Sequence, residues 1–401
     1  MARDVFDIPM PSALDGVTRA VIDLNALAHN YAELRRITDP AAGIMAVVKA
    51  DGYGHGAVAV ARTALACDAC FLAVARLNEA VILRQAGIDA PVLLFGYASP
   101  ADVAWMAANR IRASVPSLAA AKALSMNAAR SGARLRVHIK IDTGMGRLGL
   151  PADDLLPFPG NGAAVRDVLQ IARMPNIKVE GIFTHFANAD ARDKSHARRQ
   201  FDRFSALLDA LSEKGLRIRY RHAANSAATI EMPETHLDLV RPGIAQYGLW
   251  PSAALDRSRI DLRPVMRLTS TVVQVKSVGA GFAVSYGSTF RTTSPTRIAT
   301  VPIGYADGFS RRLSSTGQML VRGQRAPVIG RVCMDLTLID VGHIPDVAVG
   351  DEIVVLGRQG DEEITADDIA DRTGTINYEI VSALTARVPR VYSPDAGGDK
   401  K

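Results

Sequence analysis

The sequence predicts a (β/α)8 barrel followed by a smaller, mostly β domain. Over roughly the first 240 residues, short apolar segments alternate with amphipathic segments of helical length. Eight such units fit a closed barrel better than an open sheet. Beyond Leu262 the hydrophobic period shifts toward two. A doubly wound sheet is the alternative, but it would want a G-x-G-x-x-G loop after its first strand, and the sequence has none there.

The elements follow in order. A short strand at Ala20–Leu24 precedes a helix that we expect Asn25 to cap. Because the next strands are apolar throughout and alternate with helices, we expect a parallel sheet. These strands are Ile44–Ala50, Phe71–Ala75, Val92–Phe95, Ile111–Val115, Leu135–Ile141, Val179–Thr184, Ile218–His222 and Leu237–Val240. Helices are predicted at Asn78–Gln85, Pro100–Ala108, Leu118–Ala129 and His196–Ser212.

A stretch at Pro251–Leu262, with Pro, Ser and alternating charge, is typical of a linker. We therefore expect a barrel over 18–255 and a mostly β domain over 256–394, with an extension at 1–17 and a disordered polar tail at 395–401. A late helix is predicted at Ala366–Arg372. The strands expected in this domain are Ser270–Val278, Arg297–Pro302, Met319–Val321, Val328–Ile329, Leu336–Val341 and Glu352–Leu356.

Composition narrows the class of protein. Hydrophobic residues make up 48% and charged residues 22% of the chain, as in soluble globular proteins. The net charge is +6, but the basic residues are scattered, so we expect no nucleic-acid partner. The start lacks the pattern of a signal peptide and no apolar stretch is long enough to cross a membrane.

The three cysteines are Cys67, Cys70 and Cys333. The pair at Cys67 and Cys70 has the spacing of a zinc or redox site, but no second pair completes a zinc site. We interpret them as structural thiols and expect no metal. A low, odd cysteine count favours a cytoplasmic protein.

Lys49 ends the first barrel strand, where a barrel keeps its active site. A lysine there loses solvation, which lowers its pKa and suits Schiff-base chemistry. The alternative is a lysine that extends to solvent at the rim. The hydroxyl of Tyr53, four residues on, could reach the same pocket.

Other strand ends carry groups that suit an anionic ligand. Lys140 lies at the end of the fifth strand, Arg147 follows that strand, and His185 follows the sixth, although a histidine there can also be structural. The loops after strands seven and eight, which often hold phosphate in barrels, offer the Ser226 hydroxyl and the amides of Gly243 and Ile244. A phosphate there and a lysine at the first strand describe a pyridoxal phosphate site.

The motifs resemble the alanine racemase family of fold-type III pyridoxal phosphate enzymes from about Thr18 to Tyr392. The barrel motifs are Ala46-Val-Val-Lys49-Ala-Asp-Gly-Tyr53-Gly-His-Gly56, Lys140-Ile-Asp-Thr-Gly-Met-Gly-Arg147-Leu-Gly149, Phe183-Thr-His185-Phe-Ala, His222-Ala-Ala-Asn-Ser226-Ala-Ala and Val240-Arg241-Pro-Gly-Ile244. Those of the second domain are Val284-Ser-Tyr286-Gly, Gly304-Tyr305-Ala-Asp-Gly, Gly330-Arg-Val-Cys333-Met334-Asp335, Ile376-Asn-Tyr378-Glu and Arg387-Val-Pro-Arg390.

The resemblance implies roles for these residues. It makes Lys49 the Schiff-base lysine and one catalytic base, with Tyr286 as the second base on the opposite face. It implies that Arg241 faces the pyridine nitrogen and that His185 bridges Arg241 and Tyr286. The phosphate would be held by Tyr53, Ser226, Gly243, Ile244 and Tyr378.

Further roles concern the substrate and the assembly. By the resemblance, Arg147 contacts the phenolic oxygen of the cofactor and the substrate carboxylate, and Lys140 occupies a position that is often carbamylated. The Met334 amide receives the substrate carboxylate and Tyr305 lines the entrance. The second base comes from the partner subunit, so the resemblance implies a homodimer.

The implied function is interconversion of L-alanine and D-alanine, supplying D-alanine for peptidoglycan. A broad-specificity or serine racemase of the same fold would share nearly every motif. A decarboxylase of the same fold type fits less well, because the motifs around Tyr286 and Met334 are racemase features. A non-catalytic pyridoxal phosphate-binding protein would not need the second domain that carries Tyr286.

Overall fold

The computed structural model describes residues 17–152 and 162–393 and divides into two compact units. Unit 2 is Ala26–Arg263, and unit 1 combines Pro264 onward with the segment up to Asn25. The expected extension at 1–17, except Val17, and the expected tail at 395–401 lie outside the described residues.

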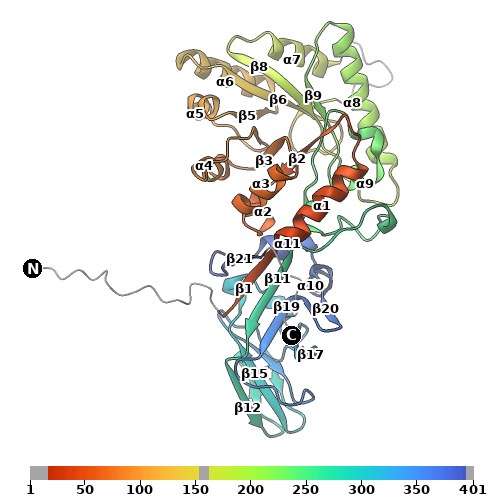
Figure 1. Cartoon of the computed structure of the whole chain (residues 1–401). Helices are drawn as coiled ribbons and strands as arrows, with labels where there is room; N and C mark the ends of the chain where they lie inside the picture. The colour runs from red at the N-terminus through yellow and green to blue at the C-terminus, as the bar shows by residue number, and fades with distance from the viewer. Residues whose placement is uncertain (1–16, 153–161, 394–401) are drawn as a thin grey trace, which may run out of the picture. The chain divides into compact units, whose positions relative to one another are not determined.

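Unit 2 is a nearly closed barrel of eight parallel strands, which confirms the predicted fold class (Figure 1). The strands run in the order β10-β2-β3-β4-β5-β6-β8-β9. Their bounds are β2 Gly43–Val47, β3 Phe71–Val74, β4 Val92–Leu94, β5 Ile111–Val115, β6 Leu135–Asp142, β8 Ile177–Phe183, β9 Tyr220–His222 and β10 Leu239–Val240. Backbone bonds from Asp238 N to Arg221 O and from Arg241 N to Ala224 O link the two end strands, each at 3.0 Å.

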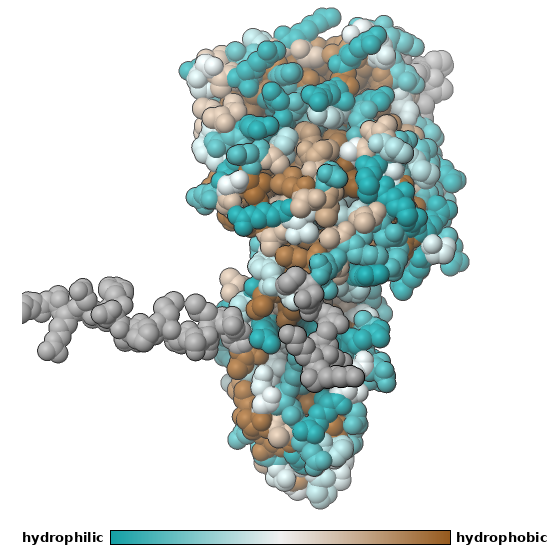
Figure 2. All heavy atoms as spheres, viewed as in Figure 1, coloured by the Kyte–Doolittle hydropathy of each residue, from teal (hydrophilic) through white to brown (hydrophobic). Residues whose placement is uncertain are grey.

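Helices cover the outside of the barrel (Figure 1). Their bounds are α1 Leu24–Ile37, α2 Lys49–Tyr53, α3 Ala57–Ala66, α4 Leu77–Gln85, α5 Val103–Ala108, α6 Leu118–Arg130, α7 Ala163–Ala172, α8 Ser195–Glu213 and α9 Ser226–Glu231. The apolar stripe of each longer helix is buried; in α8 it includes Phe204, Leu207 and Leu211. Hydrophilic residues cover much of the outer surface of the barrel helices on the face that Figure 2 shows. No helix in the described ranges is long and apolar enough to cross a membrane.

Short elements complete the barrel unit: η2 Pro100–Asp102, β7 Leu150–Pro151, η5 Pro233–Thr235, η6 Ile244–Tyr247 and η7 Arg257–Arg259. Helix α1 begins at Leu24, and the Asp23 carboxylate accepts a hydrogen bond from the Asn25 amide at 2.9 Å. The predicted Asn25 cap is therefore wrong, since Asp23 accepts at this helix start.

Unit 1 is the mostly β domain. Its main sheet follows the order β17-β16-β19-β11-β1-β21, with β20 paired to β19, and β12-β15-β18 form a second sheet. Its strands are β1 Arg19–Asp23, β11 Met266–Thr271, β12 Gln274–Val278, β13 Ala283–Val284, β14 Phe290–Arg291, β15 Thr296–Val301, β16 Gln318–Val321, β17 Gln324–Pro327, β18 Thr337–Asp340, β19 Glu352–Gln359, β20 Glu362–Ile364 and β21 Arg390–Ser393. Its helical segments are η8 Tyr286–Ser288, η9 Tyr305–Asp307, η10 Arg311–Leu313, α10 Ala366–Thr373 and α11 Asn377–Ser382.

The first strand differs most from expectation. Residues 18–25 were expected in the barrel, but β1 pairs antiparallel with β11 and parallel with β21 in the sheet of unit 1. The predicted strand Ser270–Val278 is two strands, β11 and β12, which belong to different sheets. The predicted strand Val328–Ile329 is only an isolated bridge from Val328 to Ile339.

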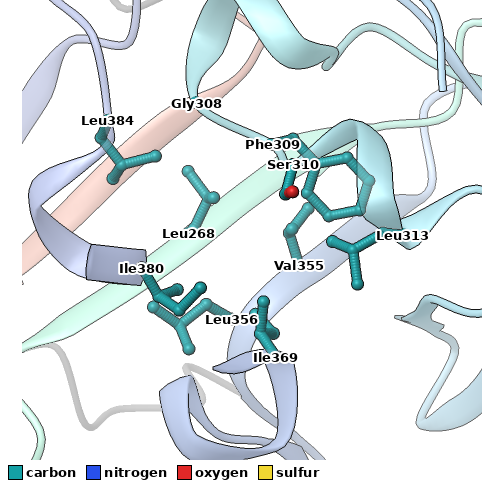
Figure 3. A pocket seen from close by; sticks show the side chains of 10 residues that line it. All are labelled: Leu268, Gly308, Phe309, Ser310, Leu313, Val355, Leu356, Ile369, Ile380 and Leu384. Carbon is teal, nitrogen blue, oxygen red and sulfur yellow. The ribbon is translucent and has the colours of Figure 1, made fainter. Parts of the chain in front are cut away.

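An apolar cavity of about 30 Å³ lies in unit 1, lined by residues that include Leu268, Phe309 and Val355 (Figure 3). That volume admits about one water molecule, and its mostly apolar lining offers such a water few partners. The cavity is too small for an amino acid or a cofactor.

Candidate active site

Lys49 lies just beyond β2, at the C-terminal mouth of the barrel. The carbonyl of Val47, two residues earlier, accepts hydrogen bonds from Gln246 Nε2 at 2.6 Å and Tyr247 Oη at 2.9 Å. These buried bonds hold the end of β2 in place. Burial lowers the pKa of Lys49, and the nearby Arg147 lowers it further. The amine is thereby shifted toward its nucleophilic, unprotonated form.

A left-handed turn follows Lys49. All four residues of Ala50–Tyr53 have φ between 51° and 61°, which costs about 1–2 kcal/mol for each non-glycine residue. Side chains stabilise the turn, since Glu79 Oε1 accepts from Ala50 N at 2.6 Å and Asp51 Oδ1 accepts from Ala57 N at 2.8 Å. The turn brings Tyr53 under Lys49, whose Nζ lies 5.7 Å from the centre of the tyrosine ring.

A small polar cradle surrounds Gly243. Ser226 Oγ accepts hydrogen bonds from Gly243 N at 2.8 Å and Ala245 N at 3.3 Å. A Cβ at Gly243 would lie only 2.7 Å from Tyr53 Oη, so the tyrosine hydroxyl reaches the same spot. Ile244 begins η6, and its amide has no partner within that helix. Two hydroxyls and a helix-start amide around a glycine fit a phosphate group.

Arg241 is buried and held from several sides. Its Nη1 donates to His222 Nδ1 at 2.9 Å, and its Nη2 donates to Thr184 O at 2.8 Å and Ala223 O at 2.9 Å. A longer contact of 3.4 Å joins Nη2 to His185 Nδ1. Burial lowers the pKa of Arg241 to about 9, so the guanidinium keeps its charge at neutral pH. Burial, and next the charge of Arg241, hold the pKa of His185 well below its usual range.

Lys140 is a buried amine without an acceptor. It is 7% exposed, and its Nζ has no hydrogen-bond partner in the described ranges. The nitrogen lies 4.8 Å from the centre of the Phe183 ring. Burial, and then Arg241 and Arg147, lower the pKa of Lys140 well below the usual value. A buried amine that feels two cations and has no acceptor in the described ranges fits a modification that would make it anionic.

The loop that carries Arg147 is organised by Asp142. Asp142 Oδ1 accepts from the amides of Gly144 and Met145 at 2.9 Å and of Gly146 at 3.1 Å. Arg147 itself is exposed at the surface of unit 2. The turn therefore presents a cation at the end of β6.

Gln200 of α8 forms hydrogen bonds with both the loop after β6 and the loop after β8. Its Nε2 donates to Thr143 Oγ1 at 3.3 Å and His185 O at 3.1 Å, and its Oε1 accepts from Ala187 N at 2.9 Å. A bond of 2.7 Å between the hydroxyls of Thr143 and Thr184 joins the same loops. One fully buried amide thus links the segments that follow β6 and β8.

The candidate residues of unit 1 form their own set. Tyr286 follows Ser285, which has φ 62° and whose Oγ donates to Arg331 O at 2.6 Å. Gly330 makes room for this turn, since a Cβ there would lie 2.8 Å from Val284 O. Tyr286 is 70% exposed in the single chain.

Tyr305 and Met334 lie on two segments joined by backbone bonds. Tyr305 N donates to Cys333 O at 3.0 Å, and Ala306 N donates to Met334 O at 3.1 Å. Gly304 is required by this approach, because a Cβ there would lie 2.2 Å from Met334 O. Tyr378 is half-buried in α11, elsewhere in the same unit.

The predicted site residues thus fall into two sets. The barrel brings together at its strand ends Lys49, Tyr53, Lys140, Arg147, His185, Ser226, Arg241, Gly243 and Ile244. Unit 1 holds the other four, which are Tyr286, Tyr305, Met334 and Tyr378. His138, His222 and Gln200 are not predicted from the sequence to have a role. The available signals were the buried position of His138 in the middle of β6 and the position of His222 at the end of β9. Gln200 gave no signal, since a glutamine on a helix is ordinarily a surface residue.

Comparisons with known proteins cover both units. The model of the alanine racemase N-terminal domain matches residues 22–251, and that of the C-terminal domain matches 265–392. The alanine racemase of Desulfosudis oleivorans is 52% identical over 377 residues, covering 93% of this chain and 96% of the relative. That of Desulforamulus reducens is 47% identical over 373 residues, covering 93% and 98%.

Solved structures of alanine racemases are also similar to this chain. The alanine racemase of Clostridium difficile 630 superposes with a TM-score of 0.88 at 38% identity, covering 94% of this chain and 95% of that one. The Bacillus anthracis enzyme with bound L-Ala-P gives 0.87 at 37% identity, covering 95% and 96%. The chain is therefore one of the two-domain barrel enzymes that racemise amino acids. Within that class, it belongs to the alanine racemase family.

Proposed function

We propose that this enzyme interconverts L-alanine and D-alanine with pyridoxal phosphate bound to Lys49, using two bases on opposite faces of the substrate. The observation that carries the proposal is the buried lysine at the barrel mouth with the polar cradle around Gly243. When bound, the cofactor supplies an electron sink that acidifies the Cα proton of an amino acid.

In this proposal the barrel residues hold the cofactor. Ser226, Tyr53, Gly243 and Ile244 bind the phosphate, with Tyr378 as a further ligand. The buried guanidinium of Arg241 would donate a hydrogen bond to the ring nitrogen of the bound cofactor. Since arginine gives up a proton reluctantly, it would leave that nitrogen unprotonated and restrain side reactions such as transamination.

The two faces need separate proton carriers, because one base cannot easily reach both. Lys49 serves one face, and its lowered pKa supports a share of free amine near neutral pH. Tyr286 serves the other, with His185 between it and Arg241. Arg147 and the main-chain amide of Met334 bind the substrate carboxylate, and Tyr305 borders the entrance.

We further propose a homodimer in which the β domain of one subunit closes the barrel mouth of the other. Support comes from the exposure of Tyr286 at 70% and Met334 at 51% in the single chain. A base and a carboxylate site open to water would forfeit the low dielectric that strengthens their interactions. The proposed role is supply of D-alanine for peptidoglycan in the cytoplasm, where the free thiols Cys67, Cys70 and Cys333 would stay reduced.

A panel of amino acids tests this function. Purified enzyme with pyridoxal phosphate should abolish the optical rotation of L-alanine and of D-alanine, with serine, lysine and arginine turned over far more slowly. The Lys49→Ala variant should lose both the activity and the visible absorbance of the lysine-bound cofactor. Failure on alanine with turnover of serine, lysine or arginine would replace the assignment by a racemase of other specificity.

A further inference from the structure

Two buried histidines extend inward from Arg241 through the barrel. His222 and His138 are each 0% exposed. His222 Nδ1 lies 2.9 Å from Arg241 Nη1, and its other ring nitrogen, Nε2, lies 2.9 Å from His138 Nδ1. Arg241, His222 and His138 therefore form one hydrogen-bonded row from the barrel mouth into its interior.

The chemistry of arginine decides where the protons lie. A guanidinium has donors and no acceptor, so His222 Nδ1 must carry a lone pair. Burial, and next Arg241, hold the pKa of His222 well below its usual range, so its single proton lies on Nε2. That proton is donated to His138 Nδ1. Burial likewise lowers the pKa of His138 to about 3, so His138 is neutral with its proton on Nε2.

The pairing of β6 with β8 is irregular at His138. The ladder between β6 and β8 shifts register there, since Val137 pairs with Val179 but His138 pairs with Gly181. A Cβ at Gly181 would lie 2.4 Å from His138 Nδ1, so only glycine admits the ring. His138 Nε2 has no hydrogen-bond partner within the described part of the chain. An irregular strand and an unpaired buried nitrogen both destabilise the fold. Packing alone therefore does not explain a histidine at position 138, and we look for another role of this side chain.

We infer that His138 is a positioning residue for Arg241. By accepting the Nε2 proton of His222, it keeps His222 Nδ1 as an acceptor and so fixes the direction of the guanidinium. In the other tautomer His222 would turn an N–H toward Arg241, donor against donor. The inference rests on the proposed function only where it adds that this guanidinium faces the ring nitrogen of the cofactor.

Two near-isosteric substitutions separate the hydrogen bond from the packing. In His138→Asn, the side-chain oxygen can take the place of Nδ1 and accept from His222. In His138→Leu, no acceptor remains. The holoenzyme is labelled with ¹⁵N-histidine, and nitrogen shifts report which ring nitrogen of His222 carries the proton; His222→Gln assigns the signals.

We expect Nε2-protonated His222 in the wild type and in His138→Asn, and a changed or mixed tautomer in His138→Leu. The ratio of transamination to racemisation should rise about tenfold in His138→Leu and stay near the wild-type value in His138→Asn. A proton on His222 Nδ1 in the wild type overturns the inference without any variant. Equal behaviour of the two variants, in tautomer and in reaction ratio, overturns it as well.

The nitrogen shifts do not depend on turnover. If the enzyme failed to racemise alanine but lost the His222 tautomer only in His138→Leu, the proposed function would fall and the positioning role would stand. If alanine were racemised and the His222 tautomer were the same in the wild type and both variants, the proposed function would stand and the positioning role of His138 would fall.

Discussion

Lys140 is a buried amine whose nitrogen lacks a hydrogen-bond partner in the described ranges. Its neighbours Arg147 and Arg241 are cations, and burial keeps its pKa well below the usual value. The unprotonated amine is the form that adds to carbon dioxide, releasing one proton to solvent, and the resulting carbamate would be an anion near Arg147 and Arg241. A carbamate would therefore remove the cost of an unpaired amine and replace charge repulsion by attraction.

We predict that Lys140 is carbamylated. Enzyme equilibrated with ¹³C-bicarbonate should show a carbamate carbon signal by NMR, and Lys140→Met should lack it. Lys178→Met, which removes an exposed lysine, is the matched control and should keep the signal. A signal that persists in Lys140→Met would assign the carbamate to another amine.

Gly243 is the residue on which the cradle depends. Gly243→Ala would place a methyl group 2.7 Å from Tyr53 Oη. Overpacking of this kind costs about 1–3 kcal/mol, so the affinity for pyridoxal phosphate should fall about tenfold or more in titrations of the apoenzyme. Gly279→Ala, where a methyl group meets nothing within 4 Å, should leave it unchanged.

The hydroxyl of Tyr53 provides a cross-check on this prediction. If the clash with that hydroxyl is the cause, the double variant Tyr53→Phe with Gly243→Ala should lose less affinity than the sum of the two single losses. Strict additivity would show that Tyr53 and Gly243 do not share the cradle.

At the scale of elements, α8 positions the site from outside the barrel. Gln200 holds the loop after β6 through Thr143 and the loop after β8 through His185 and Ala187. The first loop carries Arg147, which we propose as a ligand of the substrate carboxylate. Loosening the loops should therefore weaken substrate binding more than cofactor binding.

We predict that Gln200→Leu raises the KM for alanine about tenfold, since a buried polar network loses its centre. The amide of Ala187 should exchange hydrogen faster, while the affinity for pyridoxal phosphate changes little. Gln170→Leu on the exposed face of α7 is the control for a glutamine-to-leucine change on a helix. An unchanged KM together with unchanged exchange at Ala187 would argue against the clamp.

How far the sequence predicts these elements depends on the range of their contacts. All eight barrel strands were located, because most of them are short apolar segments that alternate with helices. The strand partners of β1 were not predicted. The residues next to β1 in sequence lie in α1, whereas its strand partners β11 and β21 lie far along the chain. The strand-end candidates were readable from position alone. The roles of His138, His222 and Gln200 could not be read from position, even though His222 ends a predicted strand, because these roles depend on partners up to 84 residues away.

At the scale of the whole molecule, the site residues are divided between two units. Lys49 belongs to the barrel, and Tyr286 belongs to the β domain. In the single chain, large apolar side chains of the β domain are open to solvent at Tyr286, Tyr305, Met334 and Ile376. Exposed apolar side chains on a domain that also carries proposed catalytic groups favour a surface that a second subunit covers.

Mixed dimers test whether a site is shared between subunits. Lys49→Ala has no cofactor lysine but keeps Tyr286, whereas Tyr286→Phe keeps Lys49 but loses the second base; each homodimer should be nearly inactive. If each site combines Lys49 of one subunit with Tyr286 of the other, a mixed dimer has one intact site and one doubly defective site. Refolding the two variants together in equal amounts makes half of the dimers mixed, so activity should return to about one quarter of the wild-type value.

If both bases came from one chain, no site in a mixed dimer would hold both, and activity would stay at the level of the separate variants. Mixing Lys49→Ala with a Lys49→Ala, Tyr286→Phe double variant gives the background, since no combination of those subunits contains Lys49.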